Sequence, residues 1–143
     1  MWRRVLSIAV AIVAVAMVAC GGESRSVEMH DTESMVWFQA EEFEYDNSDT
    51  LSRRNLSITV RYDGKYVASE VPMTILTVSP DSMVLEERFT LRIPQLADMR
   101  PDENTFIYRK NVLLKRKGTY KFRLTPDGPV EGIASVGIIV DEK

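Results

Sequence analysis

The sequence is poor in the two side chains that most often carry enzymatic and metal chemistry. It has one cysteine, Cys20, and one histidine, His30, in 143 residues. A single cysteine excludes an internal disulfide framework and a metal site built from several thiolates. A catalytic triad or a histidine metal cluster would need His30 inside a folded site. Its neighbours are polar and show no apolar periodicity, so we expect His30 to be a solvated linker residue.

The sequence also lacks an excess of basic residues and a long hydrophobic run. Lysine and arginine number 18 against 21 acidic residues, a formal net charge of -3. Nucleic-acid binding favours clustered Lys and Arg, so we do not expect a nucleic-acid partner. The longest apolar run, residues 5–19, has 15 residues, whereas a membrane-spanning helix needs about 20.

That run instead has the features of an export signal. Arg3 and Arg4 precede it, and it ends at a small residue, Ala19, directly before Cys20. A positive start, a short apolar segment and a small-residue exit are typical of a secretory signal peptide. Residues 17–20 read Met-Val-Ala-Cys, which resembles the bacterial lipobox. The resemblance implies a signal helix over residues 1–19 and a mature chain that begins with an acylated Cys20.

Acylation of Cys20 would change the properties of the mature chain. Loss of Arg3 and Arg4 leaves 16 basic against 21 acidic residues, and the only thiol is consumed. Two acyl chains anchor a protein stably to a membrane without a spanning segment. We therefore expect the membrane to be one partner of this chain, through the lipid on Cys20.

We interpret residues 20–34 as a lipidated flexible tether, because they are polar and without apolar periodicity. Among residues 21–26 only Glu23 is acidic. In some bacteria, surface export of lipoproteins follows an acidic patch behind the cysteine. We therefore expect a domain in the cell envelope that faces the periplasm, on the outer or the inner membrane.

Residues 35–143 read as one all-β domain. Leu56, Ile58, Val60 and Tyr62 alternate with polar residues, which is the period of a half-buried strand. Asp63-Gly64 follows as a turn signal. Comparable strand patterns recur at 37–45, 73–78, 83–93, 106–114, 120–124 and 133–140. Six to eight short strands at this spacing predict an antiparallel β-sandwich, immunoglobulin-like or jelly-roll-like.

Two charged segments have both a functional and a structural interpretation. The acids between Glu41 and Asp49 could offer oxygens to Ca²⁺, but alternate strand positions point to opposite faces. An edge strand protected by charge is the better interpretation. The basic residues between Arg109 and Lys117 could meet acidic headgroups or an acidic partner. We favour the solvated face of a strand and its turn.

The aromatic residues offer a weak case for ligand binding. Trp37 and Tyr66 are the candidates for a platform on which a carbohydrate ring could stack. Tyr66 lies just after the Asp63-Gly64 turn and is the better candidate for an exposed ring.

The order of these elements resembles the gliding-motility lipoprotein H family of the Bacteroidetes. The similarity rests on the lipoprotein signal, the first two strands, the segment Gly118-Thr119-Tyr120 and the ending Gly132-Ile133-Ala134-Ser135-Val136-Gly137. Gly118 fits a turn with positive φ. Tyr120 resembles a corner tyrosine whose hydroxyl binds backbone. Gly137, inside a strand, indicates close backbone packing.

The resemblance implies a lipoprotein of the cell envelope associated with gliding machinery, and it carries no catalytic residue. The first hypothesis is therefore a non-catalytic assembly or scaffold component of a motility-related or secretion-related envelope complex. The alternative is an envelope lipoprotein that binds carbohydrate or another ligand. Neither hypothesis requires a cofactor or a metal.

Overall fold

The domain is an antiparallel β-sandwich, as the strand periodicity predicts. The structure, a computed structural model, describes residues 25–63, 67–95 and 101–142. Within these ranges the elements are β1 (Arg25–Asp31), β2 (Val36–Trp37), β3 (Glu41–Asn47), β4 (Arg53–Asp63), β5 (Glu70–Val78), β6 (Val84–Arg92), β7 (Pro101–Leu113), β8 (Gly118–Pro126), β9 (Val130–Glu131) and β10 (Ile133–Glu142). The expected signal helix and Cys20 lie outside the described residues. No helix in the described ranges is long and apolar enough to cross a membrane.

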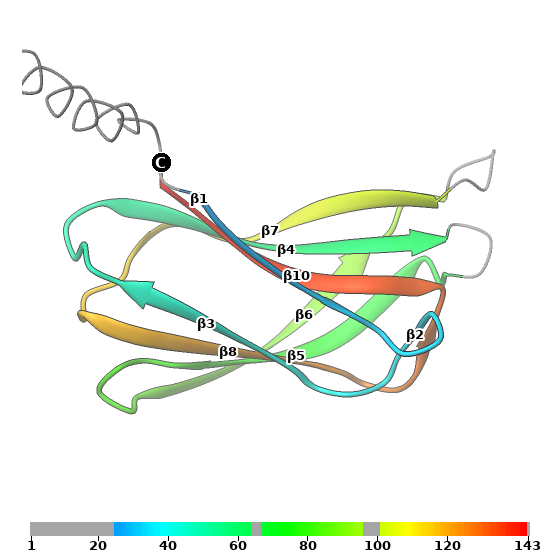
Figure 1. Ribbon diagram of the computed structural model, residues 1–143, viewed down its shortest axis with the longest axis horizontal. Coiled ribbons are helices and arrows are strands. Elements are labelled where there is room, and N and C mark those ends of the chain that lie inside the picture. Colours follow the sequence, from blue (N-terminus) through cyan, green and yellow to red (C-terminus); the bar gives the residue numbers. More distant parts are fainter. Residues whose placement is uncertain (1–24, 64–66, 96–100, 143) are drawn as a thin grey trace, which may run out of the picture.

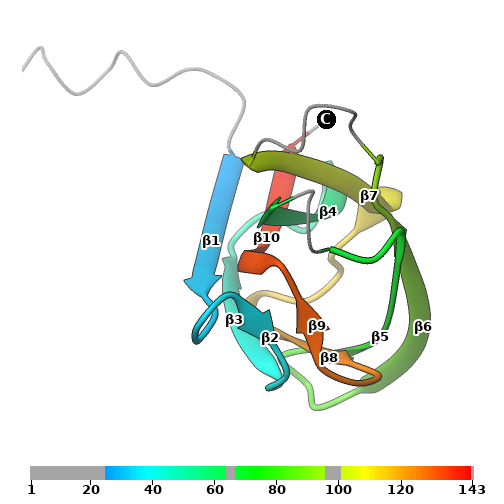
Figure 2. The same ribbon diagram turned by 90° about the vertical axis from the view of Figure 1, so that its right-hand side faces the viewer.

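The strands form two four-stranded sheets that pack face to face (Figure 1). One sheet has the order β1-β10-β4-β7 and the other β3-β8-β5-β6, while β2 and β9 form a small ribbon. Figure 2 shows this ribbon across one end of the sandwich. The edge strands β1 and β3 meet at one side of the sandwich, and the edge strands β6 and β7 meet at the other.

The core is filled by the alternating residues that the sequence singles out. Leu56, Ile58, Val60 and Tyr62 of β4 are all buried. They face side chains of the second sheet, and the most deeply buried of these are Phe43, Val71, Met73, Ile75, Leu91, Phe122 and Leu124. Burial of these apolar faces from water is the main stabilising term of the fold.

The N-terminal boundary of the domain differs from the prediction. Residues 25–31, assigned from sequence to a flexible tether, form β1 and pair with β10 from Arg25↔Asp141 to Asp31↔Ser135. β1 is an edge strand with one neighbour, so much of it faces solvent, and Val27 is 51% exposed. A strand of this kind needs few apolar residues. Residues 25–31 therefore belong to the domain, which does not begin at residue 35.

The predicted strand over residues 37–45 is also wrong in extent. β2 ends at Trp37 and β3 begins at Glu41, with Phe38, Gln39 and Ala40 between them. The indole Nε1 of Trp37 donates a hydrogen bond to the carbonyl of Gln39 at 2.9 Å. This local contact fits a chain that leaves the strand direction after Trp37. Trp37 and Phe43 are both in the core, as their shared strand parity predicts.

Gly118 and Tyr120 fit the structural roles expected for them. Gly118 has φ +123°, and a Cβ at this position would lie 2.9 Å from the Cβ of Pro80. The Tyr120 hydroxyl accepts a hydrogen bond from the backbone N–H of Arg116 at 3.1 Å. This contact closes the turn between β7 and β8 as a tyrosine corner.

Replacing Tyr120 with phenylalanine should lower the free energy of unfolding by about 1 kcal/mol, because the Arg116 N–H loses its acceptor. Tyr45 provides the control, since its hydroxyl makes no hydrogen bond in the described chain. Urea denaturation of Tyr120→Phe and Tyr45→Phe would measure both effects. Equal midpoints for the two variants would argue against the corner.

Candidate functional site

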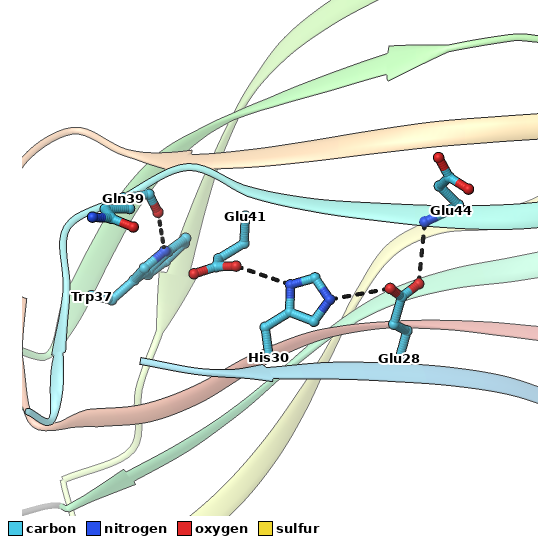
Figure 3. Close-up of polar contacts among 6 residues, drawn as sticks. All are labelled: Glu28, His30, Trp37, Gln39, Glu41 and Glu44. Carbon is cyan, nitrogen blue, oxygen red and sulfur yellow. Dashed lines mark hydrogen bonds and ion pairs between the residues drawn. The ribbon is translucent and has the colours of Figure 1, made fainter. Parts of the chain in front are cut away.

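The most organised polar cluster lies at the seam between β1 and β3, and it contains the only histidine. The ring of His30 on β1 lies between two carboxylates, with Nδ1 2.9 Å from Glu41 Oε2 and Nε2 3.1 Å from Glu28 Oε1. Glu41 belongs to β3, so this contact joins the edges of two different sheets. Figure 3 shows the three side chains in line along the seam.

Backbone and ring contacts strengthen the same seam. The other oxygen of Glu28 accepts a hydrogen bond from the Glu44 N–H of β3 at 3.1 Å (Figure 3). The His30 ring stacks on Phe43, with centroids 4.3 Å apart and planes inclined by 21°. His30 is therefore held on two edges and one face, and it is not the solvated linker residue that the sequence suggests.

The two carboxylates favour the charged form of the imidazole. Burial lowers the pKa of His30, but the hydrogen bonds to Glu41 and Glu28 raise it more, and the net result lies above the ordinary value of 6.5. A neutral ring has one N–H and one lone pair, so it can donate to only one of its two carboxylates. The doubly protonated ring donates to both, and the seam is complete only in that state.

This arrangement suits a structural clamp. Both ring nitrogens contact carboxylates, so neither faces a hydroxyl nucleophile as in a serine triad. No cluster of three or more His, Cys, Asp or Glu side chains fit to hold a metal occurs among the residues the structure describes. The histidine instead fastens the first strand of the domain to the second sheet.

The clamp predicts a pH dependence of stability. Because the folded state raises the pKa of His30, its contribution is full below the unfolded value and is lost as pH rises through the folded value. The melting temperature should therefore fall as pH increases from the ordinary pKa of histidine, 6.5, through the raised pKa of the folded state.

The variant His30→Gln should remove this pH dependence, since glutamine does not titrate in that range. The chain has no other histidine, so the wild-type slope can be assigned to one residue. Thermal melts of both proteins across the pH series make the comparison. A slope that survives in His30→Gln would exclude the clamp as its source.

A second polar seam joins β6 to β7 on the opposite side of the sandwich. Glu87 of β6 accepts hydrogen bonds from the Tyr108 hydroxyl and from Arg109, both of β7. Tyr108 also packs edge-on against Phe89, with ring centroids 5.5 Å apart. Burial and the contact with Glu87 raise the pKa of Tyr108 to about 12, so its hydroxyl stays protonated. Both open sides of the sandwich are thus closed by side chains.

The residues proposed from sequence as ligand contacts do not form a site. Trp37 is 1% exposed and belongs to the core, so its ring offers no face on which a sugar could stack, and that assignment is wrong. Tyr66, the other candidate, lies outside the described residues. Cys20 lies outside them as well, and its acylation stays a prediction.

The acidic segment has the structural character that we favoured, whereas the exposure of the basic segment fits both of its interpretations. Glu41, Glu42 and Glu44 lie on β3, which is an edge strand. Glu42 pairs with Arg123 and Glu41 with His30, so the acids protect an edge and do not converge. Lys110, Lys115 and Lys117 are exposed near the β7–β8 turn.

The sequence did contain a signal for the seam between β1 and β3, because Glu28 and His30 are two residues apart and therefore lie on the same face of a strand.

Comparisons with known proteins add little to this geometry. No family model matches the chain, and no curated protein matches it. Among solved structures it is similar to dimeric latent PorU from Porphyromonas gingivalis, with a TM-score of 0.39 and 6% identity over 85% of this chain and 13% of that one. A carbohydrate-binding module from the β-sandwich superfamily gives a TM-score of 0.36 and 12% identity over 86% of this chain and 56% of the other. The structure of infectious bursal disease virus, Gx strain, gives a TM-score of 0.34 and 9% identity over 82% of this chain and 36% of the other. The chain thus spans less than two thirds of each of these proteins.

Proposed function

We propose that this chain is a lipid-anchored protein of the cell envelope that serves as a non-catalytic assembly or scaffold component of a motility-related or secretion-related complex. The observation that carries the proposal is the position of β1. Only residues 21–24 separate the predicted lipidated Cys20 from Arg25, the first residue of a strand that belongs to the sandwich. The reach from anchor to fold is then at most about 18 Å, since an extended residue spans about 3.6 Å.

The pairing of β1 suits a protein that passes force between a membrane and a partner. β1 is antiparallel to the C-terminal strand β10 over its whole length, and the hydrogen bonds of such a pair lie perpendicular to the strands. A force applied to Arg25 along the strand is therefore carried by all the β1–β10 hydrogen bonds at once, and these bonds do not break one after another. The His30 clamp joins β1 to β3, so the force also reaches the second sheet.

Two further observations support a non-catalytic role. Both nitrogens of the only histidine are occupied by carboxylates. The segments that resemble the gliding-motility lipoprotein family, around Tyr120 and Gly137, have structural contacts, namely the tyrosine corner and the close approach of β1 to β10.

In-cell photo-crosslinking would test the proposal. A photoreactive residue placed at exposed Glu33, just after the end of β1, or at exposed Glu131 of β9 should capture a recurring set of motility or secretion components. The same residue at Lys121, exposed in the middle of β8, is the matched control. The proposal fails if the captured proteins are the same at every position, or if none belongs to an envelope complex.

The proposed periplasmic location has its own test. Protease added to intact cells should leave the domain uncut, and lysis should expose it to digestion. Removal of the domain from unlysed cells would place it on the cell surface.

Carbohydrate binding is the second candidate function, and one surface feature favours it. Phe38 is 46% exposed and lines a hollow of about 380 Å³ together with Asp31, Glu33 and Gln39. An exposed ring beside polar side chains is the chemistry of sugar recognition. Glycan-array binding that Phe38→Ala abolishes and Leu51→Ala preserves would favour this function over the scaffold.

A further inference from the structure

One end of the sandwich gathers the start of β1, the end of β10 and three loops (Figure 1). The loops follow β3, β5 and β7, and side chains join them. The Asn47 amide donates to the carbonyls of Leu114 and Arg116, both at 2.9 Å. Arg116 in turn forms an ion pair with Asp81 at 3.3 Å. We call these loops, with the adjoining strand ends, the entry end, because the chain enters the domain here from Cys20.

The entry end carries cations that its own acids do not neutralise. Arg53, Lys110, Lys115 and Lys117 are exposed and form no ion pair within the described chain. The acids with ion pairs at this end are Asp49 with Arg54, Asp81 with Arg116 and Asp141 with Arg25. Asp46, which accepts a hydrogen bond from Thr119, and Glu86, exposed two residues into β6, form no ion pair within the described chain. Four unpaired cations against these two acids leave the described side chains of this end positive, although the chain as a whole is acidic.

Apolar side chains project from the same loops. Leu51, in the β3–β4 loop, is 88% exposed, and Met83, in the β5–β6 loop, is 68% exposed. Neither contributes to the core. Exposed apolar side chains amid cations are typical of surfaces that rest on the boundary between headgroups and acyl chains.

The opposite end of the sandwich has the opposite character. Among the described residues its exposed acids are Asp31, Glu33, Glu70, Asp102, Glu103, Asp127 and Glu131. Three of them form ion pairs, Glu70 with Arg92, Glu103 with Arg61 and Asp127 with Arg88. The described residues are thus charged asymmetrically along the long axis of the sandwich, positive where the chain enters and negative at the far end.

We propose that the entry end docks on a bilayer surface that carries anionic headgroups, with Lys110, Lys115, Lys117 and Arg53 against phosphates and Leu51 and Met83 in the interfacial layer. This rests on the proposed lipid anchor. Four residues behind Cys20 allow the tip to stand only about 18 Å from the anchor, and a negative surface attracts each nearby cation. The acidic end then points away from the membrane, because the negative membrane surface repels it. This acidic end is the face presented to partners.

Thiol labelling of the full-length lipoprotein in vesicles would test this orientation. Once Cys20 is acylated, a cysteine introduced by Leu51→Cys or by Glu131→Cys is the only free thiol of the chain. In phosphatidylglycerol vesicles, a membrane-impermeant maleimide should label the Leu51→Cys protein roughly tenfold more slowly than the Glu131→Cys protein. That ratio corresponds to a tenfold excess of the docked arrangement, or about 1.4 kcal/mol.

Charge reversal identifies the source of the protection. Lys115→Glu with Lys117→Glu should restore fast labelling at Leu51→Cys, whereas Arg92→Glu, a control near the far end of β6, should not. Vesicles of phosphatidylcholine alone should reproduce the charge-reversed result, since their surface is neutral.

The outcomes separate the docking from the anchor. Equal labelling at both positions in an acylated protein would overturn the docking alone. Protection that persists in detergent would assign the surface to a second copy of the chain and also overturn it. An intact mass without acyl groups would overturn both the anchor and the docking that rests on it.

Discussion

Replacing Trp37 with alanine should lower the free energy of unfolding by about 3 to 5 kcal/mol, the range for truncation of a buried tryptophan. The side chain is 1% exposed, and its Nε1 donates to the Gln39 carbonyl at 2.9 Å. Truncation removes a large apolar ring from the core where the β2–β9 ribbon meets the sheets. Chemical denaturation followed by circular dichroism would measure the change.

The neighbouring residue supplies the matched control. Phe38 is 46% exposed, so Phe38→Ala should change stability by less than about 1 kcal/mol, as surface substitutions generally do. Comparable losses for the two variants would contradict the core position of Trp37. A carbohydrate assay that relied on Trp37→Ala would report loss of the fold, whereas Phe38→Ala tests the surface.

Gly137→Ala should produce the second largest effect, because β1 lies directly against this position of β10. A Cβ on residue 137 would lie 2.6 Å from the backbone oxygen of Glu28 and 2.2 Å from the Sδ of Met29. The methionine side chain can rotate away, but the backbone oxygen belongs to the β1–β10 pair. We expect a loss of about 1 to 3 kcal/mol, the usual range for overpacking.

The part of the fold that loses stability distinguishes Gly137→Ala from a variant that destabilises the whole domain. Amide hydrogen exchange should accelerate mainly in β1, which separates from β10 by local opening. Gly128→Ala is the control, since a Cβ there meets nothing within 4 Å. Unchanged protection of β1 in Gly137→Ala would mean that the first strand is not held by this contact.

The sequence predicts the central strands because their buried side chains recur with a period of two. β4 lies between β10 and β7, and its alternating residues Leu56, Ile58, Val60 and Tyr62 are buried as the period of two requires. Tyr120 and Gly118 could be assigned for a similar reason, because a corner hydroxyl and a positive φ each demand one kind of residue.

The edges of the sandwich could not be predicted in the same way. β1 pairs with β10, more than a hundred residues later in the chain, and its sequence is polar because one side meets solvent. The contact of His30 with Glu41 depends on two sheets meeting at their edges. Local periodicity contains no information about such a meeting. The sequence pattern therefore identifies a tether where the structure has an edge strand and a clamp.

Burial of the aromatic residues follows strand alternation. Trp37 is in the core and the adjacent Phe38 is exposed, and Phe43 shares both the parity and the burial of Trp37. Parity alone does not say which of the two faces is the inner one, so the sequence could not exclude Trp37 as a surface ring. The basic residues near Lys117 can be recognised in the sequence, but only the topology brings the β7–β8 turn to the same end of the sandwich as the β3–β4 loop and the start of β1.

The mass of the mature protein tests the central claim of a short lipid anchor joined directly to the fold. Mass spectrometry of the protein isolated from membranes should find an N-terminus at Cys20 that carries acyl groups, and Cys20→Ala should lose both the modification and membrane retention. An N-terminus at any other residue, or an unmodified thiol at Cys20, would contradict the account.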